Sequence, residues 1–254
     1  MTDQSLQFPR FYVTAPTPCP YLPGRKERKV FTELRGAEAD ALNDALSRVG
    51  FRRSQSVAYR PACEGCAACI SVRVLAKAFR PNRTMRRVLA KNRDIRISHT
   101  PPLGRMEQFA LLRRYLASRH PAGGMADMDF EEYAEMVENT PVDTSLMEYR
   151  ISSRDPDLPG RLVGTSLTDR MADGLSMVYS FYDPAVDRPS LGTYMILDHI
   201  RRAREQGLDY VYLGYWIRGS RKMAYKAKFK PLERLGPEGW FPFDEEKEVV
   251  PLED

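Results

Sequence analysis

The fold of this chain is decided by residues 175–216, which read LSMVYSFYDPAVDRPSLGTYMILDHIRRAREQGLDYVYLGYW. Residues 175–182 alternate in the way that half-buried strands do. From about residue 192 to residue 206 the period becomes helical, and Gly207 follows as a stop signal. Residues 208–216 then return to a strand pattern. A strand, a helix and a second strand are therefore expected at the centre of a mixed α/β (α+β) fold.

The flanking segments extend this order. Two further strand-like runs, residues 146–152 and 161–168, are separated by turn-forming residues and predict an antiparallel meander. A basic helix is expected at about residues 221–229. Meander, helix, strand, helix resembles the acyltransferase fold named for the Gcn5-related N-acetyltransferases (GNAT). In that fold the acyl donor lies where the strands before and after the helix splay apart, which here are residues 176–182 and 209–216.

The N-terminal part has its own pattern. Residues 38–49 have helical spacing, Gly50 follows as a stop, and residues 70–74 alternate as a short strand. Pro101 and Pro102 break the pattern. After them, residues 106–116 and 130–137 predict two helices, the second capped by Asp129 and Glu132. We therefore divide the chain into a cysteine-containing lobe, residues 1–100, and a GNAT-like acyltransferase domain, residues 101–254.

All four cysteines fall in two short, turn-rich segments of the N-terminal lobe: Cys19, Cys63, Cys66 and Cys69. Spacings of two residues let thiolates converge on one centre, as zinc and iron–sulfur sites require, and the remote Cys19 is a candidate fourth ligand. The alternative is a cluster of reduced, partly buried thiols without metal. The chemistry considered below needs no cofactor in either case.

Charge and hydropathy narrow the classes of partner. The 254 residues carry a net charge of +5, with basic residues bunched at 80–96 and 218–230. Tyr225 and Phe229 interleave with the second cluster, a mixture suited to a nucleic-acid backbone and a stacked base, although a solvated helix face is the alternative. No apolar run is long enough to span a membrane, and the first residues lack a secretory signal. A cytoplasmic protein without a membrane partner is expected.

The donor is not expected to be acetyl-CoA. Acetyl-CoA members of this fold grip the pyrophosphate with an Arg/Gln-x-x-Gly-x-Gly/Ala loop at the start of the helix, where backbone N–H groups meet the charge. The equivalent segment here, residues 188–194, reads RPSLGTY and retains one glycine. A donor with a nucleic-acid end would instead explain the basic clusters.

Several ordered motifs resemble the aminoacyl-tRNA–protein transferases of the N-degron pathway. They are CPYLP at residues 19–23, YRPAC at 59–63, GTSLTD at 164–169, SFYDP at 180–184, SLGTY at 190–194, LGYWI at 213–217 and YKAKFKP at 225–231. The short length and the CPYLP sequence are similar to the bacterial aspartate/glutamate leucyltransferase branch. The resemblance implies transfer of leucine from charged tRNA to the N-terminal α-amine of proteins that begin with Asp or Glu, which marks them for degradation.

Such a reaction suggests roles for particular residues. Asp169, expected in the loop after the strand 164–168, is a candidate to receive the proton of the amine, with a turn cap as the alternative. The candidates for contact with the ester or the terminal ribose are Tyr179, Ser180 and Tyr215. The candidates for tRNA phosphates are Arg221, Lys222, Lys226 and Lys228. Arg60 and Arg73, which flank the cysteines, are candidates to bind the acidic side chain of the acceptor.

Three classes of function stay open at this point. The first is the aminoacyl-tRNA–protein transferase, with leucine or, alternatively, arginine as the donor amino acid. The second is an acetyl-CoA-dependent transferase of the same fold, which the altered loop at residues 188–194 disfavours. The third is a non-enzymatic RNA-binding protein with a structural metal. His199 is interpreted as a helix-surface or packing residue.

Overall fold

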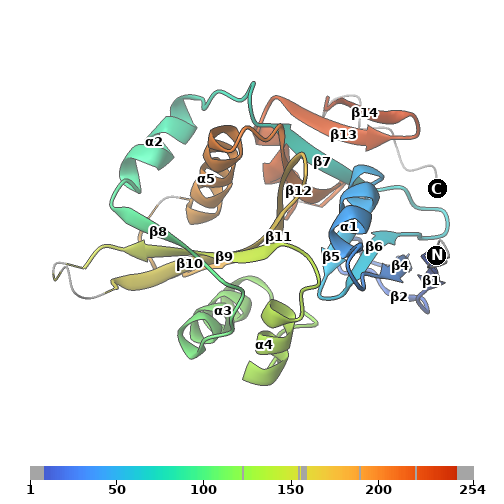
Figure 1. The fold of residues 1–254 in the computed structure, drawn as a ribbon, viewed down its shortest axis with the longest axis horizontal. Helices are drawn as coiled ribbons and strands as arrows, with labels where there is room; N and C mark the ends of the chain where they lie inside the picture. The colour runs from blue at the N-terminus through green and yellow to red at the C-terminus, as the bar shows by residue number, and fades with distance from the viewer. Residues whose placement is uncertain are drawn as a thin grey trace, which may run out of the picture.

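A computed structural model describes residues 9–244, except residues 122, 154, 156–158, 189 and 221. Its centre is an eight-stranded sheet of order β14-β13-β7-β12-β11-β10-β9-β8 (Figure 1). The strands are β7 (Cys69–Leu75), β8 (Ile95–Thr100), β9 (Thr144–Ile151), β10 (Arg161–Arg170), β11 (Gly174–Tyr182), β12 (Tyr210–Ile217), β13 (Leu232–Gly236) and β14 (Gly239–Pro242). Within this sheet, neighbouring strands pair antiparallel except for β11 with β12, which are parallel.

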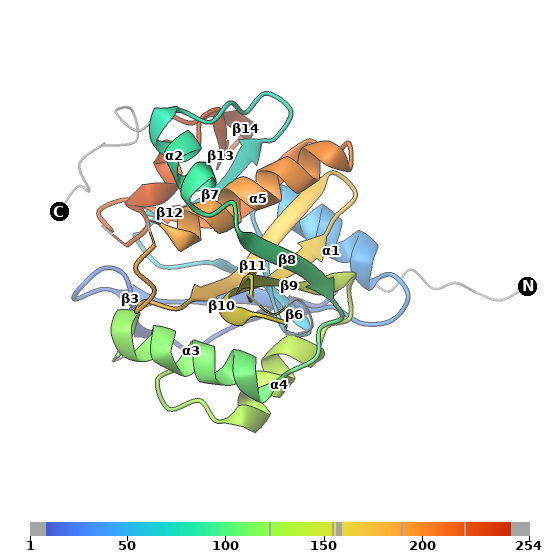
Figure 2. The same ribbon diagram turned by 90° about the vertical axis from the view of Figure 1, so that its left-hand side faces the viewer.

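Helices cover both faces of this sheet (Figures 1 and 2). One face carries α2 (Arg83–Lys91) and α5 (Leu191–Glu205), which enclose a large apolar core with β7, β11 and β12. The other face carries α3 (Met106–Arg119) and α4 (Phe130–Glu138) over a second apolar cluster. The sheet is thus buried on two sides, which explains why β10 is buried at nearly every position.

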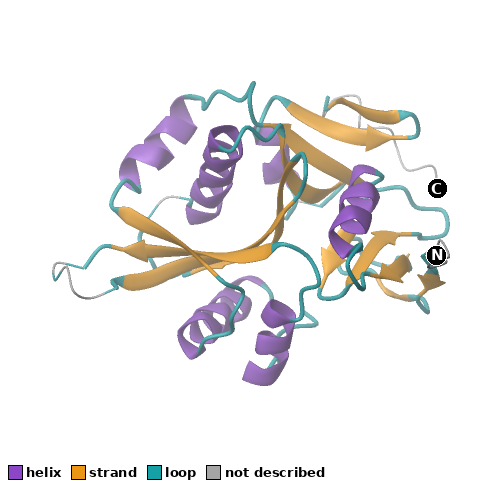
Figure 3. Cartoon of the chain, in the orientation of Figure 1, coloured by secondary structure: helices purple, strands orange, loops and turns teal. Residues whose placement is uncertain are grey.

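The N-terminal lobe is smaller and built mainly from short strands, as the colouring in Figure 3 shows. Its four-stranded sheet has the order β1-β4-β6-β5, and a separate hairpin pairs β2 with β3. The bounds are β1 (Tyr12–Val13), β2 (Thr17–Pro18), β3 (Lys26–Glu27), β4 (Lys29–Glu33), α1 (Ala39–Arg48), β5 (Arg52–Ser54) and β6 (Val57–Pro61). A third apolar cluster lies beneath α1.

The predicted fold class is confirmed: the protein is a mixed α/β acyltransferase-like structure, with α5 leading from β11 to a parallel β12. The predicted cap of α4 is also confirmed, because Asp129 accepts from the Glu132 N–H at 2.9 Å and the Glu132 side chain returns to the Asp129 N–H at 3.0 Å. Among the described residues, no helix is both long and apolar enough to cross a membrane.

Two expectations differ from the structure. The basic helix expected at 221–229 is only a short 3₁₀ helix, η1 (Ala224–Lys228), because Pro231 ends it and the chain must return to β13 at Leu232. The division at residue 100 does not coincide with a boundary between sheets, since β7 and β8 lie within the eight-stranded sheet. Periodicity identified these strands, but long-range pairing decided which sheet they join.

Candidate active site

The parallel strands β11 and β12 separate part-way along their length. Their register runs through Gly174 with Tyr210, Leu175 with Val211 and Ser176 with Tyr212. Beyond Ser176, no further pair joins them among the described residues. From Met177 onward the edge of β11 on the β12 side therefore has no strand partner in the described part of the chain, while its other edge stays paired with β10 as far as Tyr182. This is the splay in which the acyl donor was expected.

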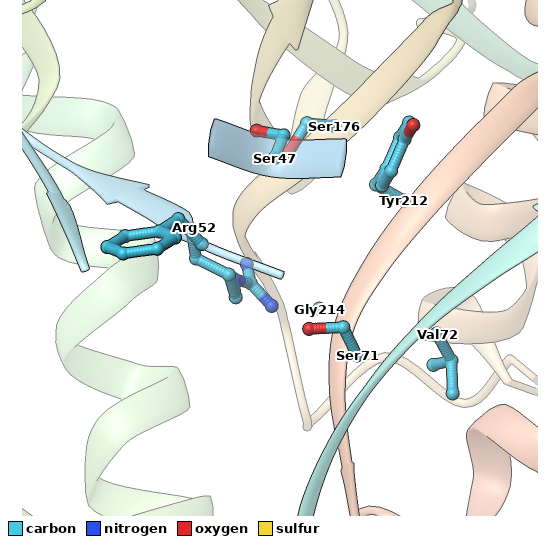
Figure 4. Close-up of a pocket in the computed structure, with 8 residues that line it drawn as sticks. Ser47, Arg52, Ser71, Val72, Ser176, Tyr212 and Gly214 are labelled. Atoms are coloured by element: carbon cyan, nitrogen blue, oxygen red, sulfur yellow. The ribbon is translucent and has the colours of Figure 1, made fainter. Parts of the chain in front are cut away.

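Arg52, from β5 of the N-terminal lobe, bridges the two strands at the point where they separate. Its guanidinium donates to the carbonyl oxygens of Met177 and Val178 on β11, both at 3.0 Å, and to that of Leu213 on β12 at 3.3 Å. Figure 4 shows the side chain reaching from β5 toward Gly214. Gly214 has φ +73°, and a Cβ there would overlap the guanidinium. Through Arg52, the N-terminal lobe thus fixes the distance between β11 and β12 at the point where they separate.

Lys226 is placed differently from the predicted phosphate contact. The residue is only 5% exposed, and its Nζ donates to the Tyr215 carbonyl at 2.6 Å. Burial holds the pKa of its amine well below the usual range, and the nearby Arg52 guanidinium lowers it further. Lys226 therefore points into the protein beside β12, and as placed it cannot reach a phosphate on the surface.

The other members of the basic cluster lie outside the core. Lys222 and Lys228 are exposed, as is Tyr225 between them. Lys222 lies near His120, whose pKa is lowered by burial and then by the charges of Lys222 and Arg119. Arg221 falls outside the described residues. Lys222, Tyr225 and Lys228 therefore belong to an exposed basic segment, and Tyr225 lies near Tyr182 at the far end of β11.

Tyr179, Ser180 and Tyr215 all lie on the splayed strands. Burial, and then the neighbouring Tyr21, raise the pKa of Tyr179 to about 12, so its phenol is a hydrogen-bond donor at neutral pH. Ser180 is half-buried and lies 2.9 Å from Ser166, Oγ to Oγ. The Tyr215 hydroxyl is directed at the N-terminal lobe, with the Gly50 carbonyl at 2.9 Å and the Tyr59 carbonyl at 3.2 Å.

Asp169 does not lie in a turn, so its predicted position is wrong. It is within β10 and 1% exposed, and both of its carboxylate oxygens accept from Arg53 at 2.7 Å. Thr144 adds a third hydrogen bond at 2.7 Å. These contacts favour a structural role, because the carboxylate is enclosed and accepts three hydrogen bonds from within the protein. Sequence spacing could not show this, since the partner lies 116 residues away.

The four cysteines, in contrast, do come together. A pocket of about 90 Å³ is lined by Cys19, Cys63, Cys66 and Cys69, and by Tyr21, Arg25, Tyr59 and Tyr215 among others. Burial, and then the neighbouring Cys63 and Cys66, raise the pKa of the Cys69 thiol to about 12. Tyr215 and Tyr21 connect this pocket with the splay, because Tyr215 is on β12 and Tyr21 lies beside Tyr179.

The fit of a metal to this pocket can be judged from its donors. Four sulfurs are the ligand type that zinc and iron–sulfur clusters take. Yet within the described part of the chain, no three Cys, His, Asp or Glu side chains are arranged so that they could hold a metal ion. Bound metal and reduced thiols therefore both remain predictions.

The two arginines expected at the acceptor are in different positions. Arg73 is buried in β7, where it pairs with Glu233 at 2.8 Å and lies 3.5 Å from the centre of the Tyr210 ring. Its guanidinium is thereby occupied, and the expected contact with an acceptor is not supported. Arg60 is exposed over the Phe51 ring and is not part of the cysteine pocket. Arg25 lines that pocket, together with Lys26, Glu27 and Lys29.

Sequence reasoning missed two features of this site. Arg52 was not singled out, although two consecutive arginines in a short strand are a sign that at least one of them is buried in a specific pair. His199 is not on the helix surface: it is fully buried, with both ring nitrogens in hydrogen-bond contact. Of the alternatives named for it, packing in the core is the correct one.

Comparison with known proteins identifies the family of this chain. Family models described as the C terminus and N terminus of arginine-tRNA-protein transferase match residues 107–236 and 17–87. The chain belongs to this family. The predicted family is thereby confirmed, and the protein is an aminoacyltransferase. Its family acts on two substrates, an aminoacyl-tRNA and a protein.

Curated relatives match over nearly the whole chain. A protein of Sphingopyxis alaskensis is 60% identical over 94% of this chain and 93% of its own length. One of Azorhizobium caulinodans is 57% identical over 96% of this chain and 100% of its own. Both are named aspartate/glutamate leucyltransferase. Among solved structures, L-PGS from Bacillus licheniformis aligns with 79% of this chain and 64% of its own, at 13% identity and a TM-score of 0.49.

Proposed function

We propose that this protein transfers leucine from charged tRNA to the N-terminal α-amine of proteins that begin with Asp or Glu. The observation that carries the proposal is near full-length identity of 55–60% to relatives named aspartate/glutamate leucyltransferase. The geometry supports it, since a splayed strand pair with an exposed basic edge adjoins a separate pocket for a second substrate. The proposed setting is the cytoplasm, as a step that marks proteins for degradation by the N-degron pathway.

The chemistry needs little beyond positioning. The amine nitrogen attacks the ester carbonyl carbon, a C–N bond forms, the bond to the ribose oxygen breaks, and the proton lost by nitrogen ends on that oxygen. An α-amine has a reference pKa of about 7.7–8.0, so a usable fraction is unprotonated near neutrality. In the proposed arrangement the ester lies in the splay. Ser180 contacts the amine from the face of the sheet that it shares with Ser166, whereas the Tyr179 phenol lies on the opposite face, beside Phe181.

The tRNA would lie over the exposed patch. Lys222 and Lys228 supply charge for phosphates, and Tyr225 offers a ring on which a base of the single-stranded 3′ end can stack. Tyr215 holds β12 against the N-terminal lobe and so keeps the splay in register with the cysteine pocket. We place the acidic side chain of the acceptor in that pocket, beside Arg25, because a guanidinium pairs with a carboxylate in two parallel hydrogen bonds.

The proposal is tested with purified protein and tRNA charged with labelled leucine or, separately, labelled arginine. Peptides that differ only in an N-terminal Asp, Glu or Ala serve as acceptors. Leucine incorporated into the Asp and Glu peptides alone is expected. Incorporation of arginine instead would change the donor, and tRNA binding without any transfer would point to the RNA-binding alternative.

Lys228→Ala and Lys226→Met compare the contributions of an exposed and a buried lysine to tRNA binding. Lys228→Ala is expected to reduce the slope of log affinity against log salt by about 0.7–0.9, the value of one lost phosphate contact. Lys226→Met should leave the slope unchanged, because its amine faces the Tyr215 carbonyl. Fluorescence anisotropy with labelled tRNA at several salt concentrations gives both slopes. Equal slopes for the two variants would contradict the placement.

Arg25→Ala and Arg73→Ala separate acceptor recognition from folding. Loss of a charge-assisted pair costs about 1.5–3 kcal/mol, so Arg25→Ala is expected to raise the KM for the Glu peptide about tenfold or more, with little change in melting temperature. Arg73→Ala should instead lower the melting temperature, because it leaves Glu233 without its partner. Peptide titrations and thermal unfolding measure the two effects. An unchanged KM in Arg25→Ala would remove Arg25 from the acceptor site.

A further inference from the structure

A chain of four side chains runs from α5 through β10 to the open edge of β11. His199 Nε2 lies 2.8 Å from Thr168 Oγ1, which lies 3.3 Å from Ser166 Oγ. Ser166 Oγ lies 2.9 Å from Ser180 Oγ, across the pairing of β10 with β11. The first three residues are 0–3% exposed, whereas Ser180 is half-buried. The hydrogen-bonded series therefore leads from the buried His199 to a half-buried hydroxyl on β11, one of the two splayed strands.

At the His199 end of this series, the donor and acceptor nitrogens of the ring are fixed. His199 Nδ1 lies 2.7 Å from the backbone carbonyl oxygen of Met195, and a carbonyl oxygen can only accept a hydrogen bond. The proton of the neutral ring is thus on Nδ1, and Nε2 is left as an acceptor. Burial lowers the pKa of His199, which keeps the ring neutral. The adjacent Asp198, which pairs with Arg201 and Arg202, acts in the opposite direction and raises the pKa of His199, but burial is the larger effect.

The protonation of His199 determines which hydroxyl group donates in each of the next hydrogen bonds. Thr168 must donate its single proton to Nε2, so between Thr168 and Ser166 only Ser166 can donate. Ser166 then has no proton left for Ser180, and Ser180 must donate to Ser166. This is the one assignment in which all three contacts are hydrogen bonds, and buried hydroxyl groups strongly favour being paired.

We infer that His199, Thr168 and Ser166 are positioning residues that make Ser180 an obligate hydrogen-bond acceptor toward the splay. With its proton committed inward, Ser180 Oγ offers only lone pairs to a substrate. It accepts one N–H of the attacking α-amine, which directs the nitrogen lone pair at the ester carbonyl. This inference rests on the leucyl transfer proposed above and names the group that orients its nucleophile.

The position of the proton on the His199 ring can be measured without an activity assay. In uniformly ¹⁵N-labelled full-length protein, long-range ¹H–¹⁵N correlation spectra report which ring nitrogen carries the proton. The chain has three histidines, and His99→Gln and His120→Gln assign the other two signals without changing His199. A neutral ring protonated on Nδ1 at pH 7 is expected. A proton on Nε2, or an imidazolium, would overturn the inference.

The consequence is measured by three substitutions in β10. Thr168→Val removes the donor to His199 and frees Ser166 to donate toward Ser180, so kcat is expected to fall about tenfold, with an unchanged KM for tRNA. Thr168→Ser keeps the hydroxyl and should stay within about twofold of the parent. Thr165→Val is the matched control, since Thr165 is a fully buried threonine of the same strand whose hydroxyl has no hydrogen-bond partner among the described residues.

The outcomes separate cleanly. Equal losses in Thr168→Val and Thr165→Val, or no loss in either, would overturn the inference. Should Thr168→Val fail to fold, retained activity in Thr168→Ser together with the histidine spectrum still decides it. A parent protein that transfers no leucine would refute the proposed function, while the spectrum separately reports the hydrogen-bond order.

Discussion

Replacing Arg53 with Met is expected to lower the free energy of unfolding by about 3–5 kcal/mol, because it leaves the Asp169 carboxylate buried without its cation. The Arg53 and Asp169 side chains are each only 1% exposed and are joined by two hydrogen bonds of 2.7 Å. This pair connects β5 of the N-terminal lobe with β10 of the large sheet. Its loss would therefore loosen the contact that brings Arg52 to the splay.

Urea unfolding followed by fluorescence measures the loss. Arg35→Met is the matched control from the same lobe, since the Arg35–Glu33 pair is largely exposed and such pairs contribute about 0–1 kcal/mol. The double substitution of Arg53→Met with Asp169→Asn removes the unpaired charge and should recover much of the stability. A loss below about 1 kcal/mol in Arg53→Met would contradict a structural role for the pair.

Asp169→Asn in the otherwise unchanged protein distinguishes this role from catalysis. If Asp169 receives the amine proton, the variant would lose most of its turnover even when all of the protein is folded. With the structural role, turnover per folded molecule is retained and only stability falls. The two outcomes are separated by normalising the transfer rate to the folded fraction at the assay temperature.

Gly214→Ala is expected to reduce leucyl transfer about a hundredfold. A residue with a side chain at φ +73° is strained by about 1–2 kcal/mol, and the added Cβ would overlap the Arg52 guanidinium. Arg52 would then leave its carbonyl partners on β11 and β12. A displacement of about 1 Å in groups that position a substrate can cost about 10²-fold in rate. Single-turnover transfer from charged tRNA measures this loss.

Gly207→Ala provides the control for backbone strain alone. Gly207 has φ +75°, at the end of α5, and nothing lies within 4 Å of the position its Cβ would take. Gly207→Ala should lower the free energy of unfolding by about as much as Gly214→Ala does, but it should keep its transfer activity. Combining Gly214→Ala with Arg52→Ala removes the overlap, so stability should partly return while transfer stays low. Equal activity of the two glycine variants would show that the Arg52 contact has no part in transfer.

The strands and helices of the acyltransferase part were predictable because their signals are local. The alternation at 175–182, the helical period up to residue 206 and the stop at Gly207 require only neighbouring residues, and they agree with β11 and α5 to within one residue. The cap formed by Asp129 and Glu132 is equally local, since its two partners are three residues apart. The four cysteines line one pocket, although no three Cys, His, Asp or Glu side chains among the described residues are placed to hold a metal ion.

Charged residues were the least predictable, because their environment depends on distant partners. Lys226 belongs to a basic run that suggested a surface, yet it lies in the protein against the Tyr215 carbonyl. Arg73 is adjacent to the cysteine segment in sequence, yet its ion-pair partner is Glu233. A buried charge is tolerated only with such a partner, and spacing along the chain does not report partners 100 or more residues away.

The sequence by itself determined the order of the elements, the family and the splayed strand pair, because periodicity and ordered motifs are written along the chain. Tertiary structure alone decided which groups face the splay. It placed Arg52 across the two strands, enclosed Asp169 with Arg53, and linked His199 to Ser180 through two hydroxyl groups. The physical reason is that hydrogen-bond direction and charge pairing depend on three-dimensional neighbours, which side-chain type and spacing leave open.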